Sequence, residues 1–342
     1  MDHHGEAVQP QVRMRRKARR TPAVLAALLG LACALATTGG GARAEPFPTR
    51  PIRLIVPFPP GGPADVMGRL IAQCLTATLG QVIVDNRPGG GSTLGAREVA
   101  RADPDGYTLL VGSAATLAIG PTLYRNIGYD PATAFAAVAS FSSTPYVMVT
   151  GPKISAKTVR DVIADAKAHP GKLNVGVPNG APPHMIAAWF KDTTATDIVI
   201  VPYKGAATVV TDLIGGQIEL AFETTSVTLA HLRDGSIRPL GVATRERLPE
   251  LPDVPTMIES GVPGFVADSW IGVLAPAATP PDIVDKLNTA INAGLQAPDM
   301  QARLKALASQ AQPGTPQAFA AFMAAENPKW TAMAKLSNLK PE

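Results

Sequence analysis

The fold of this chain follows from residues 57–65, which read Pro57-Phe58-Pro59-Pro60-Gly61-Gly62-Pro63-Ala64-Asp65. An apolar run at residues 52–56 precedes this stretch and predicts a buried strand, and apolar residues at helical spacing follow it from Met67 to Leu79. Pro63 suits the first position of that helix, because the N–H group that proline lacks would have no partner there. A glycine turn at a helix start presents unpaired N–H groups, and the helix dipole also favours an anion. The turn has neither the Lys nor the Ser/Thr of a phosphate-binding loop, so the pattern favours a small carboxylate.

The pattern of the first 44 residues is typical of a secretory signal peptide. A basic cluster at residues 13–20 precedes an almost wholly apolar run from Ala23 to Ala36, and Ala42-Arg43-Ala44 offers a cleavage site. The apolar run is too short for a comfortable membrane span. We therefore expect cleavage near Ala44 and export to the periplasm. A lipid anchor through Cys33 is the alternative, although the residues before Cys33 fit it poorly.

The net positive charge of the chain comes from this predicted signal peptide, called the leader below. The whole chain carries a formal net charge of +4, whereas residues 1–44 contain seven Lys/Arg and two Asp/Glu, or +5, which leaves −1 for the rest. A chain without a basic stripe is not expected to bind nucleic acid. Cys74 is the one cysteine after the leader, so the mature chain cannot form an internal disulfide. Its position on an apolar helix stripe predicts a small core residue.

Short apolar strands alternate with helical patterns after residue 44, which predicts parallel sheets flanked by helices. Two apolar extended segments, Pro145–Val149 and Trp270–Leu274, are expected to cross between two lobes. We expect residues 45–148 plus 270–342 to form lobe 1 and residues 149–269 to form lobe 2. Two lobes joined by two strands can hinge, and a ligand then binds between facing strand ends. The main strands are expected at 52–58, 82–84, 107–111, 173–177, 198–201, 218–222 and 238–242. The two terminal helices are expected at 281–295 and 316–336.

Several short motifs occur together, in one order, through the mature sequence. They are PIRLIVPF at 51–58 with Gly61-Gly62 and Asp65, DNRPG at 85–89 with Gly95, PDGYTLL at 104–110, VPYKG at 201–205, DLIGGQ at 212–217, LPDVPT at 251–256, Trp270 and Ala275-Pro276. Through them the chain resembles the Bug-type receptors of tripartite tricarboxylate transport, which are extracytoplasmic solute-binding proteins. The resemblance implies an α/β, two-lobed periplasmic-binding-protein fold (type II-like) with two crossover strands at the hinge, a ligand cleft and no catalysis. It also implies a small carboxylate ligand (a di- or tricarboxylic acid, an acidic amino acid or an aromatic acid) and membrane permease subunits as partners.

In receptors of this kind, backbone N–H groups and ordered waters from two loops of the first lobe hold most of the ligand carboxylate. The matching residues here are Pro60-Gly61-Gly62, with Phe58 before them, and Gly112-Ser113-Ala114. Backbone donors and water satisfy an anion without a buried Lys or Arg beside it. Each loop could instead be an ordinary strand-to-helix turn. Asp65 either favours the helix dipole and pairs with free N–H groups, or accepts from a ligand ammonium or hydroxyl.

The second lobe is expected to supply the selective wall of the cleft. Residues 177–184 read VPNGAPPH, where relatives have a Gly- and Ser-rich loop that ends at the matching histidine. The three prolines remove N–H donors, which predicts a stiffer, less polar wall and a flatter or more apolar acid. Asn179 and Gly180 are candidate ligand residues in this loop. His184 either contacts the ligand or caps and packs near the helix start.

Two further strand ends contribute candidates to the same wall. Tyr203 offers a ring and a hydroxyl, Gly205 permits close backbone approach, and Lys204 between them is expected to be solvated. Glu223 follows the strand at 218–222, at a position where relatives commonly have Asp. Its longer side chain could reach further into the cleft or pair with the backbone. Because of this departure, the identity of the ligand does not carry over from the relatives.

An enzyme is disfavoured, because the chain lacks the patterns that catalytic chemistry needs. The glycine run at 89–95 does not have the spacing of a dinucleotide loop, and neither Gly91-Ser92 nor Gly112-Ser113 forms a G-x-S-x-G elbow. The histidines after the leader are too widely spaced for a zinc motif. No catalytic residue, metal ligand or cofactor is therefore predicted. We expect a monomer whose closed, liganded form is recognised by a permease or, alternatively, by a membrane signalling kinase.

Overall fold

Ten strands form one continuous mixed sheet in the computed structural model, which describes residue 1, residues 47–337 and residue 339. The predicted cleavage site and Cys33 lie outside the described residues, as does the predicted signal peptide apart from Met1. The strand order is β2-β1-β3-β9-β4-β7-β5-β6, and β8 and β10 also pair with β4. The strands are β1 (Ile52–Val56), β2 (Val82–Asn86), β3 (Thr108–Gly112), β4 (Phe135–Thr150), β5 (Asn174–Pro178), β6 (Val199–Tyr203), β7 (Leu220–Thr224), β8 (Arg238–Val242), β9 (Asp268–Pro276) and β10 (Gln310–Ala311).

Helices connect most of the strands. They are α2 (Pro63–Leu79), α3 (Thr93–Ala100), α4 (Gly120–Leu123), α5 (Val159–Ala168), α6 (Pro182–Thr194), α7 (Ala206–Ile214), α8 (Thr225–Arg233), α9 (Pro281–Gln296), α10 (Pro298–Ala306) and α11 (Pro316–Leu336), with a 3₁₀ turn η1 (Gly90–Ser92) and a π-helical turn η2 (Ala115–Ile119). The two terminal helices predicted from the sequence are α9 and α11, whereas α10 and β10 were not predicted. Within the described part of the chain, no helix has both the length and the apolar character needed to cross a membrane.

The pairing of the strands is parallel at both ends of the sheet and antiparallel in its middle. Strand β1 runs parallel to β2 and β3, and β5 runs parallel to β6 and β7. Strand β9 is antiparallel to both β3 and β4, and β4 is antiparallel to β7 and β8. The sheet is therefore not parallel throughout as predicted, because the chain passes between the two strand series through strands that run against their neighbours.

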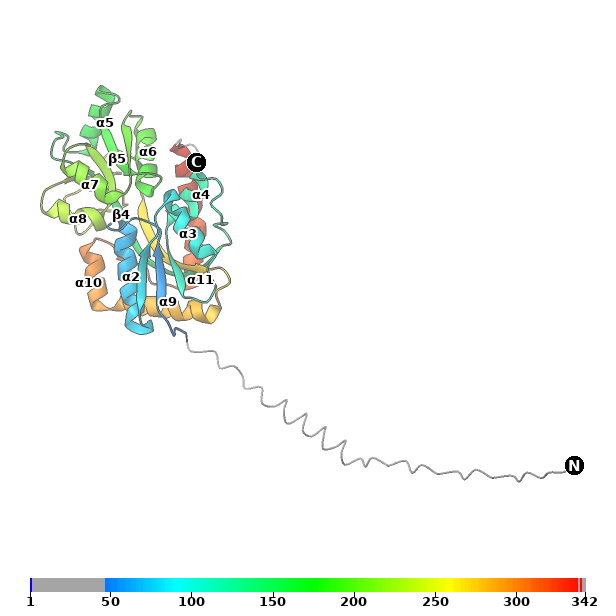
Figure 1. The fold of residues 1–342 in the computed structure, drawn as a ribbon. Coiled ribbons are helices and arrows are strands. Elements are labelled where there is room, and N and C mark those ends of the chain that lie inside the picture. The colour runs from blue at the N-terminus through cyan, green and yellow to red at the C-terminus, as the bar shows by residue number, and fades with distance from the viewer. Residues whose placement is uncertain (2–46, 338, 340–342) are drawn as a thin grey trace. The chain divides into compact units, whose positions relative to one another are not determined.

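Strand β4 belongs to both halves of the sheet. Its first part, from Phe135 to Pro145, pairs with β9, and its last part, from Tyr146 to Thr150, pairs with β7 and β8. The two segments predicted as crossings lie within β4 and β9. Figure 1 shows helices α5 to α8 grouped around β5 on one side of β4, with α2, α9, α10 and α11 on the other side. The two-lobed fold class is confirmed, and the residue boundaries of the lobes stay a prediction.

Helix α2 begins and packs as its sequence dictates. Gly62 is its N-cap with extended backbone angles, Pro63 is its first residue, and the helix ends before Gly80, whose φ is +86°. Its buried stripe packs on α9, where a side chain in place of Gly294 would collide with Cys74. Cys74 is 2 % exposed, and burial raises the pKa of its thiol to about 11, so the prediction of an inert core residue is confirmed.

Candidate ligand-binding site

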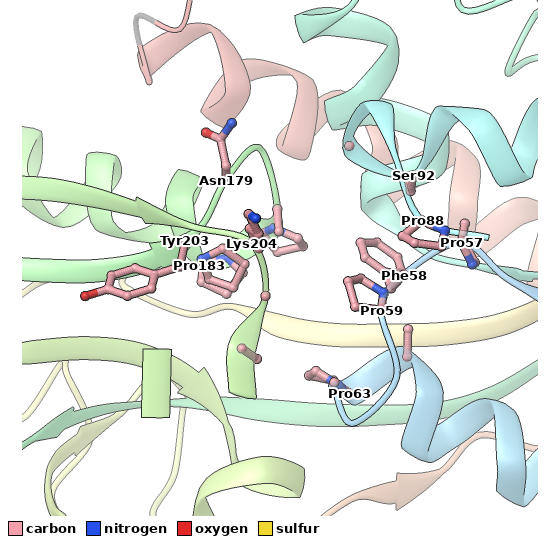
Figure 2. A pocket seen from close by; sticks show the side chains of 18 of the residues that line it. Pro57, Phe58, Pro59, Pro63, Pro88, Ser92, Asn179, Pro183, Tyr203 and Lys204 are labelled. Carbon is pink, nitrogen blue, oxygen red and sulfur yellow. The ribbon is translucent and has the colours of Figure 1, made fainter. Parts of the chain in front are cut away.

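A cavity of about 860 Å³ lies at the carboxyl ends of the parallel strands of both halves. Its first wall consists of residues from the loops after β1, β2 and β3, and its second wall consists of residues from the loops after β5 and β6. In Figure 2, Phe58 and Pro59 of the first wall face Pro183 and Lys204 of the second. The cavity floor is formed by residues of the central strands, namely Tyr146 of β4, Glu223 of β7, and Ser269 and Ile271 of β9.

The glycine turn after β1 brings helix-start amides to the cavity. Gly61 has a φ of +81°, a left-handed conformation that favours glycine. Gly62, Pro63 and Ala64 border the cavity. Because first-turn amides have no partner inside a helix, the Gly62 and Ala64 N–H groups suit an anion. The turn thus has the geometry expected of an anion site, and ligand binding there stays a prediction.

Asp65 supports this turn from behind and does not border the cavity. Its carboxylate accepts hydrogen bonds from the Gly61 N–H (3.0 Å), from Arg69 (3.1 Å) and from the Asn86 side chain (3.0 Å), and the residue is 4 % exposed. Burial alone would raise the pKa of Asp65, but the three hydrogen-bond donors together lower it below its ordinary value. The structure therefore gives Asp65 a loop-holding role, the first of the two alternatives that the sequence left open.

Two buried serine hydroxyls border the first wall. Ser92 is 2 % exposed and Ser113 is 6 % exposed, and neither Oγ atom has a hydrogen-bond partner among the described residues. Buried hydroxyl groups without partners are rare because they cost free energy. Both hydroxyls can therefore donate to a ligand oxygen. Ser113 was predicted, whereas Ser92 was missed, although the glycine run after β2 marks a loop at the same sheet edge.

The second wall is poor in hydrogen-bond donors. Helix α6 begins with Pro182 and Pro183, and both line the cavity with Pro178 and Pro202. Across the two walls nine prolines border the cavity, so much of its surface has rings and no N–H groups. The structure places the three prolines of the segment at 177–184 on this wall, and the less polar ligand inferred from them stays a prediction.

His184 lies behind the second wall. It is 5 % exposed and does not border the cavity, while the Gly180 N–H points to its Nδ1 at 3.5 Å. Gly180 has a φ of +64° at this turn. Burial lowers the pKa of His184 to about 4, so the imidazole is neutral near pH 7. The structure therefore favours the capping and packing role for His184 over direct ligand contact.

At the end of β6, the hydroxyl group of Tyr203 does not point toward the first wall of the cavity. The Tyr203 hydroxyl donates to Asp212 at 2.9 Å, and in Figure 2 it points away from Phe58. Lys204 is exposed at the edge of the cavity. A Cβ atom on Gly205 would lie 3.8 Å from the Pro59 ring, so the two walls approach each other closely at this glycine, as its residue type had suggested.

Glu223 is a fully buried acid on the cavity floor. It is 0 % exposed, and neither carboxyl oxygen has a hydrogen-bond partner among the described residues. Burial raises the pKa of Glu223 to about 8, an effect that the nearby Thr224 backbone opposes only weakly. The neighbouring Tyr146 is 2 % exposed, and its pKa is raised chiefly by burial. At pH 7 both groups are therefore mainly neutral.

The structure brings many of the predicted ligand residues together and sets the others behind them. Those that border the cavity are Phe58, Pro60, Gly62, Ser113, Asn179, Tyr203, Gly205 and Glu223. Those that do not are Gly61, Asp65, Gly112, Ala114, Gly180 and His184, of which Gly112 is held tightly against Leu274. The sequence reasoning missed Pro88, Ser92, Tyr124, Tyr146, Ser269 and Ile271. No motif marks the last three, because their place on the floor depends on how β4 and β9 pair.

A second cavity of about 590 Å³ lies against the same strand β9. Asp268 and Trp270 line this second cavity, whereas Ser269 and Ile271 line the first. Side chains alternate between the two faces of a strand, so β9 separates the two cavities. Burial, and to a smaller extent the negative charge of Glu326, raises the pKa of Asp268 to about 6.

Comparison with known proteins identifies the family. Residues 67–339 match the family model described as Tripartite tricarboxylate transporter family receptor. The chain belongs to the tripartite tricarboxylate transporter receptor family. This family consists of extracytoplasmic receptors that bind a substrate, which confirms the resemblance read from the motifs.

Individual members of this receptor family are similar over nearly their whole length. BugT from Bordetella pertussis (strain Tohama I) is 38% identical over 322 residues, which cover 92% of this chain and 98% of BugT. The R. palustris protein Rpa4515, solved with adipate, has a TM-score of 0.83 and 36% identity, covering 86% of this chain and 100% of that chain. The periplasmic binding protein BugD has a TM-score of 0.81 and 32% identity, with coverages of 86% and 100%.

Proposed function

We propose that this chain captures a small organic carboxylate between its lobes by hinge closure and delivers it to a tripartite tricarboxylate-type membrane transporter. The observation that carries the proposal is the donor set of the first wall, in which the Ser92 and Ser113 hydroxyls lie unpartnered in the same cavity as the first-turn amides of α2. The one cationic side chain that borders the cavity within the described residues is the exposed Lys204. A carboxylate held by neutral donors can leave again without breaking a buried ion pair. The complex of the related R. palustris protein with adipate supports this ligand class.

The walls also indicate the body of the ligand. Nine proline rings and Phe58 border the cavity, and they offer an apolar surface with few donors. An acid with a flat or aliphatic body suits such walls better than a densely hydroxylated one. This supports an aliphatic diacid or an aromatic acid over citrate-like acids as the ligand.

A thermal-shift screen tests the proposed ligand class. Protein purified from periplasmic extract would be heated with mono-, di- and tricarboxylates, acidic amino acids and, for comparison, sugars. A true ligand at 100 times its Kd stabilises the native state by about 2.7 kcal/mol, which raises the Tm by about 5 °C in a chain of this size. Stabilisation by sugars with no response to any acid would refute the proposal. The mass of the same protein measures cleavage near Ala44, and light scattering measures whether it is a monomer.

Ser113→Ala tests the donor wall directly. We expect the variant to bind its best acid about tenfold more weakly, because one hydrogen bond to a charged group contributes about 1.5 kcal/mol. The matched control is Ser142→Ala, since Ser142 is also buried with an unpartnered hydroxyl but lies outside the cavity. Calorimetric titration of both variants should show a loss in the first alone. Equal affinities for Ser113→Ala and the unaltered protein would place the carboxylate elsewhere.

Delivery to a transporter needs a cellular readout. Deletion of the gene should abolish uptake of the labelled acid, and the unaltered gene should restore it. Uptake that persists in the deletion strain, with loss of an acid-induced transcriptional response, would favour the sensor-kinase alternative instead. The two outcomes differ only in the partner that recognises the closed form.

A further inference from the structure

We propose that Glu223 selects the ligand from the cavity floor, where its neutral carboxyl group donates a hydrogen bond to an oxygen at the far end of the bound acid. The ligand is then an acid with an apolar body, one carboxylate at the first wall and a second oxygen acceptor at the floor. This inference rests on the proposed function, because it assigns the second end of the same ligand.

The Glu223 carboxyl group is buried, yet neither of its oxygens makes a side-chain hydrogen bond among the described residues. The residue is 0 % exposed, both of its carboxyl oxygens are unpartnered among the described residues, and it borders the cavity. Its neighbours along β7, Phe222 and Thr224, are also buried, and its partner across the β4 pairing is Val147. Apart from the Thr224 backbone, which lowers the pKa of Glu223 slightly, the cavity side is where this carboxyl group can gain a hydrogen-bond partner.

Burial keeps Glu223 neutral at pH 7, and the ionisable groups around it do not counter this effect. The elements packed against β7 are β4, β5, α6, α7 and α8, and their ionisable side chains are Tyr146, His184, Lys191, Asp192, Asp212, His231 and Arg233. None of these charges shifts the pKa of Glu223, which burial raises to about 8. His184 and Tyr146 are themselves held neutral by burial. The remaining charged groups nearby are Lys204 at the cavity edge and Asp268, which acts on Tyr146.

An acceptor oxygen fits this floor better than a ligand ammonium. Glu223 supplies an O–H donor, and the hydroxyl groups of Tyr146 and Ser269 border the same floor. A ligand ammonium would pair best with an ionised Glu223, but burial opposes that charge, and the protein cation that borders the cavity among the described residues is Lys204 at its edge. The floor therefore selects for a carbonyl or carboxylate oxygen.

The two donor groups lie far apart across the sheet. Ser113 follows β3, and Glu223 lies in β7, with β9 and β4 between them. Three strand spacings amount to about 14 Å between backbones. Both residues border the same cavity, which the nine prolines also line. A ligand with polar groups at both ends of an apolar chain matches this spacing.

Three six-carbon acids test the assignment. Hexanoate, adipate and 6-aminohexanoate share one carboxylate and differ at the far end, which is methyl, carboxylate or ammonium. Calorimetric titrations of the protein from periplasmic extract would be run from pH 6 to pH 9. We expect adipate to bind at least tenfold more tightly than the other two at pH 7. Its Kd should rise above pH 8, approaching tenfold per pH unit, because deprotonated Glu223 repels it. Tightest binding of 6-aminohexanoate, or a Kd for adipate that does not change with pH, would overturn the assignment.

Variants at Glu223 separate its role from other titrating groups. Glu223→Gln keeps the shape and an N–H donor, so adipate should bind within about threefold of the unaltered protein at pH 7 but without the rise in Kd above pH 8. Glu223→Leu should lose the preference for adipate over hexanoate. The control Glu246→Gln makes the same change at an exposed loop residue and should keep the pH profile of the unaltered protein. A rise in Kd that persists in Glu223→Gln would assign the titration to another group and overturn the inference.

The outcomes distinguish this inference from the proposed function. If none of the three acids and no acid of the thermal-shift screen binds at any pH, both fail. If adipate binds and Ser113→Ala weakens it, but the Glu223 variants behave like the unaltered protein, the receptor function stands and only the role of Glu223 is refuted. Circular dichroism of each variant confirms that it is folded before titration.

Discussion

At the scale of single residues, three acids show how burial and partners decide the state of one functional group. Asp65 is buried but receives hydrogen bonds from three donors, so its pKa lies below the ordinary value. Glu223 is fully buried with only the Thr224 backbone to oppose the effect of burial, so its pKa rises to about 8. Asp268 is partly buried near Glu326, and its pKa rises to about 6. A carboxyl group is thus ionised at Asp65, behind the cavity wall, and neutral at Glu223, on the cavity floor.

Asp268→Asn should make the protein more stable above pH 6. Below about pH 4 the Asp268 carboxyl is protonated in both folded and unfolded states. Between pH 4 and pH 6 the folded state keeps a proton that the unfolded state releases, so the stability of the unaltered protein falls as pH rises through about 6. We expect a gain of about 2 kcal/mol for the variant at pH 8 and little difference at pH 4.

Urea unfolding at pH 4, 6 and 8 measures this effect. Asp192→Asn is the matched control, because it makes the same change at an exposed residue of α6 that does not line the second cavity. A constant difference between Asp268→Asn and the unaltered protein across the three pH values would contradict the prediction.

At the scale of elements, the start of α2 and the turn before it behave as one unit. Asp65 lies in the first turn of α2 and accepts from the Gly61 N–H, so the helix holds the glycine turn that precedes it. Asn86 at the end of β2 donates both to Asp65 and to the Phe58 carbonyl, and this ties the turn to the neighbouring strand. The amides that face the cavity are therefore set in place before any ligand arrives, which reduces the ordering cost of binding.

Asp65→Ala should loosen this unit and weaken ligand binding. The Gly61 N–H would lose its acceptor and the Asn86 amide would lose one of its two, at a cost of about 2 kcal/mol in the free energy of unfolding. We expect the affinity for the best acid to fall about tenfold, because the turn must then be ordered on binding. Denaturant unfolding and calorimetric titration measure the two effects separately.

Asp161→Ala is the control for Asp65→Ala. Asp161 forms a capping box with Thr158 at the start of α5, away from the cavity, so its removal should weaken that helix start and leave the affinity for the acid unchanged. If Asp65→Ala loses stability and yet binds the acid normally, then the turn does not depend on α2 for its shape.

At the scale of the whole described unit, the cavity lies between two walls that the central strands connect. The walls approach each other at Gly205 and Pro59 and again at Gly180 and Tyr124, where a Cβ on either glycine would lie within 4 Å of the other wall. Strands β4 and β9 run between the halves that carry these walls. The proposed closure over a ligand then requires small backbone changes in β4 and β9. It also requires that the two walls can meet at Gly205 and Gly180.

Gly205→Phe should act as a wedge between the walls. Gly205 has an extended backbone that any residue can adopt, so the change adds bulk without backbone strain. We expect the radius of gyration of the unaltered protein to fall when adipate is added and that of the variant to stay constant, as measured by small-angle scattering. Gly205→Ala should close normally, because its Cβ would meet Pro59 at an ordinary 3.8 Å. Closure of Gly205→Phe to the same radius would show that the walls do not meet there.

Local patterns in the sequence predicted much of this structure. The start of α2, the parallel strand series, both terminal helices and the proline wall depend on neighbours in the chain, and each was predicted from residue type and spacing. The antiparallel pairing of β4 and β9 and the short elements α10 and β10 were not, because they depend on contacts between distant segments.

By itself, the sequence determined the glycine turn at the start of α2, the family and the class of fold, because a glycine turn at a helix start is a local property and the motifs keep their order along the chain. Only the tertiary structure decided which polar groups reach the cavity. It placed Asp65 and His184 behind the walls, put Glu223 on the floor, and left the hydroxyls of Ser92 and Ser113 without partners among the described residues. Those outcomes depend on burial and on pairing between strand residues that lie 70 to 141 positions apart, from Thr150↔Leu220 to Phe135↔Pro276, which no local pattern encodes.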